Sequence, residues 1–169
     1  MKHGLAILPF RGTARAALGP LIEDLASLGL DADLLSEADV PEGAYDRRRG
    51  QYRAEAFLGI ARRVAGAAGK RVLGVTDRDL YAEDLNFVFG LAESPGRAAV
   101  ISFARLRQTD DAARQRARAV KEAVHELGHT FGLDHCPDPR CVMHFSNTLA
   151  DTDRKGREFC PSCRARLAG

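Results

Sequence analysis

The sequence predicts a fold of the α+β class. Three observations predict it: short apolar runs suited to strands, amphipathic stretches with apolar residues at helical spacing, and one long uninterrupted helical stretch near the C-terminal end. The chain has 169 residues, of which 45% are hydrophobic, which suits one domain with a substantial core. We therefore expect residues 1–169 to form a single domain.

The N-terminal part begins with a strand and a helix. Gly4 to Phe10 is a short, nearly continuous apolar run, which is typical of a buried strand. Apolar residues then recur at helical spacing up to Leu28, and Gly29 can end that helix. Leu30 to Leu35 is a candidate for a second strand.

The middle of the chain continues with a loop, a helix and three strands. The polar, turn-rich segment 41–50 predicts a surface loop. From about Tyr52, apolar side chains at helical spacing predict a second amphipathic helix. The strand candidates that follow, separated by turn-like segments, are Arg71–Thr76, Leu85–Leu91 and Ala98–Leu106.

A long helix is predicted from about Asp110 to Phe131. Asp110 and Asp111 suit its N-terminus, and no glycine or proline interrupts it before Gly128. Beyond Gly132, prolines and four cysteines replace the regular periodicity. That tail is too short and too poor in apolar residues to fold without cross-links.

The long helix carries a cluster of candidate metal ligands. At ~100° per residue, His125 and His129 lie one turn apart on one face, so both imidazoles can bind one ion. Glu126 lies beside them, where it can hold a water bound to the metal. Gly132 can adopt the left-handed conformation that turns the chain back, which brings His135 in as a third ligand. Three histidines with an open fourth position are typical of a catalytic zinc site.

This arrangement predicts hydrolysis of peptide bonds by a metal-activated water. Zinc lowers the pKa of its bound water to ~7 and polarises a carbonyl oxygen. Glu126 would accept the proton of that water as general base and pass it to the leaving nitrogen. The alternative is that the HExxH pattern arises by chance among solvent-facing helix residues. Gly132 and His135, at the two further required positions, argue against it.

The motif HExxHxxGxxH followed by a methionine, here Met143, resembles the signature of the metzincin metallopeptidases. Four cysteines restrict the resemblance to a smaller group of these peptidases. They are Cys136, Cys141 and the pair in the run Cys160-Pro-Ser-Cys163. The combination is similar to that of the archaemetzincins, a family of small metzincin-like proteins with a cysteine-rich tail. The motif covers about Val124 to Cys163.

The resemblance implies a compact zincin fold with a mixed twisted sheet. The sheet and the active-site helix form an upper part, about residues 1–132, and a short cysteine-rich lower part, about residues 133–169, follows the third histidine. The resemblance also implies that Met143 is the Met-turn residue, whose side chain forms an apolar floor under the zinc ligands. A peptide substrate would add to the edge strand above the cleft, for which Leu85 to Leu91 is the candidate.

The resemblance further suggests that the cysteines hold a second, structural zinc. The spacings C-x4-C and C-x2-C independently match a tetrahedral thiolate site. Two disulfides or four free thiols are the alternative, which a reducing compartment disfavours. No signal peptide is apparent, so we expect a cytoplasmic protein with two Zn²⁺. The proposed structural ligands are Cys136, Cys141, Cys160 and Cys163. His3 and His144 are predicted not to be ligands.

Composition limits the partners. A formal net charge of +2, from 25 basic and 23 acidic residues, is too small to predict nucleic acid or a membrane surface as partner. We therefore predict a zinc metallopeptidase that acts on peptides or unfolded protein segments. One alternative is a zinc-bound module that binds peptides without cleaving them. The presence of Glu126 argues against it, because such a module has no need of a general base. Another is a zinc ribbon that contacts nucleic acid through its basic tail. No run of aromatic residues accompanies those basic residues to stack on bases, which argues against this alternative.

Overall fold

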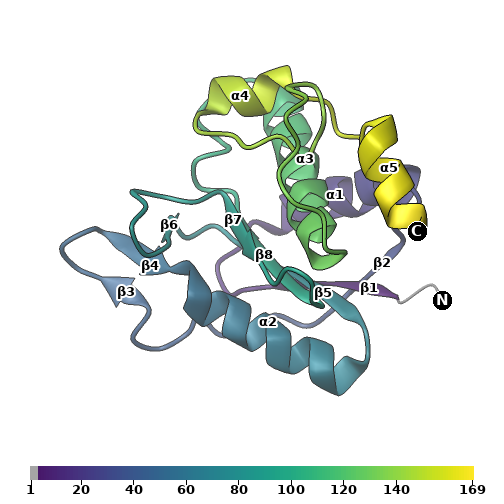
Figure 1. The fold of residues 1–169 in the computed structure, drawn as a ribbon. Helices are drawn as coiled ribbons and strands as arrows, with labels where there is room; N and C mark the ends of the chain where they lie inside the picture. The colour runs from purple at the N-terminus through teal and green to yellow at the C-terminus, as the bar shows by residue number, and fades with distance from the viewer. Residues whose placement is uncertain (1–3) are drawn as a thin grey trace.

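A computed structural model describes residues 4–169, so His3 lies outside the described residues. A central sheet is flanked by helices on both faces, and a second, smaller sheet lies beside it (Figure 1). The strands are β1 Leu5–Pro9, β2 Ala32–Leu34, β3 Tyr45–Asp46, β4 Gln51–Arg53, β5 Arg71–Thr76, β6 Leu80–Tyr81, β7 Gly90–Ala92 and β8 Ala98–Ser102. The helices are α1 Arg15–Ser27, α2 Ala54–Ala68, α3 Ala112–Thr130, α4 Leu149–Arg154 and α5 Pro161–Ala168.

The central sheet is mixed, with strand order β2-β1-β5-β8-β7. The first four strands in this order run parallel to one another, and β7 pairs antiparallel with β8. The strand β7 therefore forms one edge of the sheet, beside α3. The smaller sheet has the order β3-β4-β6.

Alternating side chains of the central strands face two separate cores. Leu5 and Ile7 of β1 face the core that α1 and α3 cover, whereas Ala6 and Leu8 face the core that α2 covers. Every residue of β1 is buried. This two-sided burial explains why the predicted strand is a continuous apolar run rather than an alternating one.

The predicted strand Leu85–Leu91 is wrong in its bounds. Residues 85–89 form no strand in the structure, apart from one isolated bridge between Val88 and Leu80, and β7 begins only at Gly90. The reason is that the bridge to Leu80 holds this apolar segment toward the smaller sheet. The predicted position at the sheet edge is confirmed for β7.

Other elements differ from the expectation mainly in length. The strand Arg71–Thr76 is confirmed with the predicted bounds, whereas the strand predicted to reach Leu106 ends at Ser102. The predicted loop 41–50 contains β3, which pairs antiparallel with β4. The tail, whose sequence shows no regular periodicity, forms the two short helices α4 and α5.

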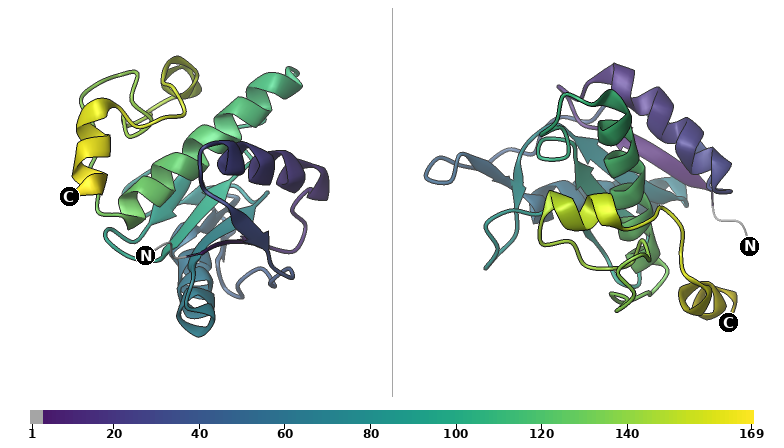
Figure 2. Two further views of the ribbon diagram at one scale, coloured as in Figure 1. Left: turned by 90° about the vertical axis from the view of Figure 1, so that its right-hand side faces the viewer. Right: turned by 90° about the horizontal axis from the view of Figure 1, so that it is seen from above.

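The tail packs on the side of α3 opposite to α1, as both views of Figure 2 show. A capping box between Thr148 and Asp151 starts α4. Arg118 of α3 then binds the carboxylate of Asp153 at 2.7 and 2.8 Å. These contacts hold α4 against the helix that carries the HExxH motif. Among residues 4–169, no helix combines the length and apolar character that crossing a bilayer requires.

Candidate active site and cysteine cluster

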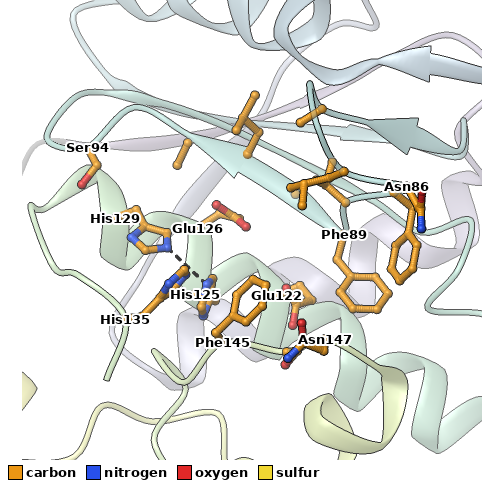
Figure 3. A pocket seen from close by; sticks show the side chains of 18 residues that line it. Asn86, Phe89, Ser94, Glu122, His125, Glu126, His129, His135, Phe145 and Asn147 are labelled. Atoms are coloured by element: carbon orange, nitrogen blue, oxygen red, sulfur yellow. Dashed lines mark hydrogen bonds between the residues drawn. The ribbon is translucent and has the colours of Figure 1, made fainter. Parts of the chain in front are cut away.

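Three histidines converge at the end of α3 (Figure 3). His125 and His129 lie on its last two turns, and His135 follows on the tail. The potential ligand atoms of the three lie within 4.8 Å of one another, and the Nε2 atoms of His125 and His129 are 3.2 Å apart. Two nitrogen ligands of a tetrahedral zinc ion are separated by roughly 3.3 Å. The spacing of the imidazoles therefore fits a single zinc ion.

Gly132 ends the helix and reverses the chain, as its position predicted. Its φ is +89°, a conformation that favours glycine. The Gly132 amide donates to the carbonyl of His129 at 2.8 Å, and the Leu133 amide donates to that of Gly128 at 3.1 Å. This pair of bonds is the Schellman arrangement of a helix C-terminus. The turn brings His135 back toward the two histidines of α3.

Main-chain carbonyls orient two of the imidazoles. The Nδ1 atom of His125 lies 2.7 Å from the carbonyl oxygen of Val142, and that of His129 lies 2.7 Å from the carbonyl of Leu133. Because a carbonyl oxygen only accepts, each Nδ1 carries the proton and each Nε2 is left with a free lone pair. Burial lowers the pKa of His125 well below its ordinary value. Both effects favour the neutral form that binds a metal.

Glu126 is buried beside the histidines and faces the cleft (Figure 3). Burial raises the pKa of Glu126 well above its ordinary value, and the neighbouring carboxylate of Glu122 raises it further. The ammonium group of Lys155 acts in the opposite direction. A cation bound by the histidines would also lower this pKa, because a nearby positive charge favours the carboxylate form.

A cleft with a volume of about 480 Å³ contains these side chains. One wall is the free edge of β7, and the floor is the face of α3 that carries the histidines. The opposite wall comes from the tail. The lining includes Leu85, Asn86, Phe87, Val88, Phe89, Gly90, Leu91, Ala92, Ser94, Glu122, His125, Glu126, His129, His135, Phe145, Ser146 and Asn147. An extended peptide can therefore lie between an unpaired strand edge and the three imidazoles.

Met143 lies fully buried beneath α3. It contacts the helix at Gly128, where a Cβ atom would come within 2.3 Å of the Met143 Sδ atom. The turn that contains Met143 therefore packs directly under the segment between His125 and His129. The neighbouring His144 lies outside the group of converging histidines, and its Nδ1 atom lies 2.8 Å from the carbonyl of Cys136.

The four cysteines gather in the tail. The Sγ atoms of Cys136 and Cys160 are 3.8 Å apart, as are those of Cys141 and Cys163, and all four lie within 4.8 Å of one another. Thiolates around a tetrahedral zinc are separated by roughly 3.8 Å, whereas the sulfurs of a disulfide are ~2.05 Å apart. All four thiols are free. Their geometry fits a metal and does not fit two disulfides.

Two main-chain amides donate to a sulfur of this cluster. The amides of Met143 and Cys160 each lie 3.4 Å from the Cys141 Sγ atom. The backbone amide of Cys163 lowers the pKa of the Cys160 thiol to about 7, whereas burial raises the pKa of Cys136 and of Cys163. A metal cation would favour the thiolate form at all four positions.

Two residues near the histidines were not predicted from the sequence. Lys155 is fully buried, and its Nζ atom lies 3.2 Å from the Glu122 Oε1 atom and 3.4 Å from the His125 Nδ1 atom. The position of Glu122, three residues before His125, is a signal that it shares the face of α3 that lines the cleft. No comparable signal exists for Lys155, because a lysine in a polar tail is ordinarily exposed.

The chain is similar to known proteins over most of its length. The family model "Peptidase family M54" matches residues 26–168. An archaemetzincin of Methanopyrus kandleri is 55% identical over 126 residues, which cover 75% of this chain and 71% of that protein. An archaemetzincin of Pyrococcus furiosus is 48% identical, and the match covers 99% of this chain and 93% of that protein.

Solved structures show the same fold. The crystal structure of archaemetzincin from Methanopyrus kandleri has a TM-score of 0.86 and 44% identity, covering 98% of this chain and 93% of that chain. The crystal structure of archaemetzincin from Archaeoglobus fulgidus, complexed with malonate, has a TM-score of 0.86 and 38% identity. The match covers 96% of this chain and 99% of that chain. These similarities confirm the predicted α+β class with a mixed sheet.

Proposed function

The chain belongs to the archaemetzincins of peptidase family M54 and is a zinc metallopeptidase, and on that premise we propose that Glu126 is its general base. In this proposal His125, His129 and His135 hold the catalytic zinc. The observation that carries it is the convergence of the three imidazoles beside a buried carboxylate in a cleft with a free strand edge. A zinc-dependent peptidase of Methanocorpusculum labreanum has the same fold, with a TM-score of 0.86, 29% identity and coverage of 97% of this chain and 100% of that chain.

The protein's own residues supply the proton transfers. When bound, zinc acts as a Lewis acid that polarises the scissile carbonyl and makes water more acidic. Glu126 accepts one proton of the attacking water, whose oxygen bonds to the carbonyl carbon. As the C–N bond breaks, Glu126 delivers that proton to the leaving nitrogen. The buried surroundings of Glu126 support this role, because they raise its pKa and let it hold the proton between the two transfers.

The free edge of β7 positions the substrate in this proposal. The strand Gly90–Ala92 pairs with β8 on one side only, and its other side faces the cleft. An extended peptide can add to this edge through main-chain hydrogen bonds, which are independent of its side chains. Its scissile carbonyl then lies between the strand edge and the face of α3 with Glu126. The substrate class is therefore extended peptides or unfolded protein segments.

The four cysteines hold a second zinc in this proposal, with a structural role. Four thiolates leave no open coordination position, so no reaction takes place there. The site joins Cys136 and Cys141, on either side of the turn after His135, to Cys160 and Cys163 at the start of α5. It therefore holds the segment that carries Met143 against α3.

The proposed function is tested by digestion of a peptide mixture, followed by mass spectrometry. We expect zinc-loaded wild type to cleave a subset of the peptides, and Glu126→Gln to cleave none while it retains the same zinc content and the same thermal unfolding curve. Glu55→Gln is the matched control, because Glu55 is exposed on α2, on the opposite face of the sheet. If wild type leaves every peptide intact at full zinc occupancy, the proposed function fails.

A further inference from the structure

The cleft continues along α3 beyond the histidines, into a region that the proposed reaction does not use. Glu122 lies at its base, three residues before His125. Figure 3 shows Glu122 between the rings of Phe145 and Phe89, with Asn147 next to Glu122 and Asn86 farther out, beyond Phe89. We call this region the side pocket. Its five residues are Asn86, Phe89, Glu122, Phe145 and Asn147.

The walls of the side pocket are aromatic. The Phe89 ring is buried and packs edge-on against Phe87, with 5.2 Å between the ring centroids. The Phe145 ring lies 5.0 Å from that of His135. Phe145 is 45% exposed and lines the cleft, so an incoming group can reach it. Aromatic walls of this kind stack favourably with an aromatic side chain.

The base of the side pocket is a carboxylate whose charge is already compensated. The Glu122 Oε1 atom lies 3.2 Å from the Nζ atom of Lys155 and accepts a hydrogen bond from Thr152 at 3.4 Å. Lys155 is fully buried and also donates to the carbonyl of His144 at 3.2 Å. No hydrogen bond from the described residues reaches the second oxygen, Oε2, although Glu122 lines the cleft.

This combination selects a neutral hydrogen-bond donor. A second cation would be repelled by Lys155, and an anion would be repelled by Glu122 and Glu126. A purely apolar side chain would leave the Oε2 atom desolvated and unpaired. A side chain with an aromatic body and a neutral donor at its tip satisfies both the walls and the base.

We propose that the side pocket binds a tyrosine side chain of the substrate, at a position flanking the scissile bond, with the phenol donating a hydrogen bond to Glu122. This inference rests on the proposed function, because it places the tyrosine in the same peptide that lies across Glu126. It makes Glu122 a specificity-determining residue, and it makes Lys155 the residue that holds the Glu122 carboxylate in place.

The test uses blocked peptides that differ only in one residue, tyrosine or phenylalanine, at each position beside the scissile bond. For zinc-loaded wild type we expect kcat/KM to be about tenfold higher with tyrosine at one of these positions. The double variant Glu122→Leu/Lys155→Met removes the acceptor without leaving an unpaired buried charge. In this variant the ratio of kcat/KM for the tyrosine peptide to kcat/KM for the phenylalanine peptide should fall to about one. A ratio is used because it is unaffected by a general loss of folded protein.

Arg118→Met/Asp153→Leu is the matched control, since this pair also joins α3 to the α4 segment but does not line the cleft. It should keep the preference for tyrosine. A second arm measures binding of the same peptides to zinc-loaded Glu126→Gln. If wild type cleaves no peptide, the proposed function fails, and the binding arm still decides the inference. The inference is overturned if the tyrosine and phenylalanine peptides are bound equally or cleaved equally. It is also overturned if Glu122→Leu/Lys155→Met keeps the preference for tyrosine.

Discussion

The main chain of Gly90 lies directly against the side chain of Glu126. A Cβ atom at position 90 would come within 2.7 Å of the Glu126 Cγ atom and 2.8 Å of its Oε1 atom. It would also come within 2.7 Å of the carbonyl oxygen of Val100 on β8, which the sheet holds in place. The edge strand therefore leaves room for the carboxylate only because residue 90 is glycine.

Gly90→Ala should reduce peptide cleavage because the added methyl group displaces the Glu126 carboxylate. A displacement of about 1 Å in a catalytic group reduces the rate by about 100-fold. The measurement is kcat on one peptide, together with the zinc content. Gly66→Ala on α2 is the control, since its Cβ atom meets nothing within 4 Å, and it should leave kcat unchanged. Wild-type kcat in Gly90→Ala would show that this contact does not position Glu126.

Gly128→Ala should destabilise the protein, because its Cβ atom would lie 2.3 Å from the Met143 Sδ atom and 3.0 Å from a ring carbon of Phe159. Overpacking of this kind costs about 1–3 kcal/mol of unfolding free energy. Denaturant unfolding of Gly128→Ala, Met143→Ala and the double variant measures the coupling between the two sites. We expect the double variant to be more stable than the sum of the single effects predicts. Simple additivity would mean that Met143 does not fill the space under Gly128.

Removal of metal should unfold the cysteine-rich tail, whereas a reducing agent should not, because the four thiols are free. Loss of a structural zinc costs several kcal/mol, so a strong chelator should lower the Tm by an amount on the order of 10 °C. Cys163→Ser should lower the Tm similarly and should bind one zinc ion fewer per chain than wild type. A Tm that falls with reductant, but is insensitive to the chelator, would favour disulfides instead.

The ion pair between Arg118 and Asp153 should make stability depend on pH. Hydrogen bonds from Arg118 hold the pKa of Asp153 below its ordinary value. Because the folded pKa lies below the unfolded value of ~3.9, the stabilisation is fully present above about pH 4 and is lost as the pH falls through the folded pKa. Asp153→Asn should therefore be less stable than wild type at neutral pH, and the difference should shrink under acid.

The measurement is the unfolding free energy of wild type and Asp153→Asn from about pH 7 down to about pH 2. Asp31→Asn serves as control, because Asp31 is exposed and makes no ion pair within the described part of the chain. A difference between wild type and Asp153→Asn that stays constant across this range would rule out the ion pair as its cause.

The sequence predicted the histidine group because its geometry is local. His125 and His129 are related by one helical turn, and Gly132 supplies the reversal that His135 needs, so short-range spacing determines all three. The gathering of the four cysteines was implied by the resemblance to the archaemetzincins, and the spacing within the two close pairs agreed with it. Their convergence in the structure agrees with that reasoning.

The contacts that depend on long-range packing were not predictable. Burial of Lys155 depends on Glu122, which lies far away in the sequence, and a single lysine in a polar tail gives no sign of it. The start of β7 was misplaced for the same reason, because residues 85–89 have strand-like apolar character but Val88 bridges to Leu80 instead. Strand preferences depend on which partner is available.

The central claim is that peptide cleavage depends on a zinc ion held by the three histidines. The most direct measurement is the rate of hydrolysis of one peptide by wild type and by His129→Ala, together with the zinc content of each. We predict that wild type binds two zinc ions per chain and cleaves the peptide. His129→Ala should keep only the zinc of the cysteine cluster and should not cleave. Cleavage at the wild-type rate by His129→Ala with a single zinc ion would contradict the claim.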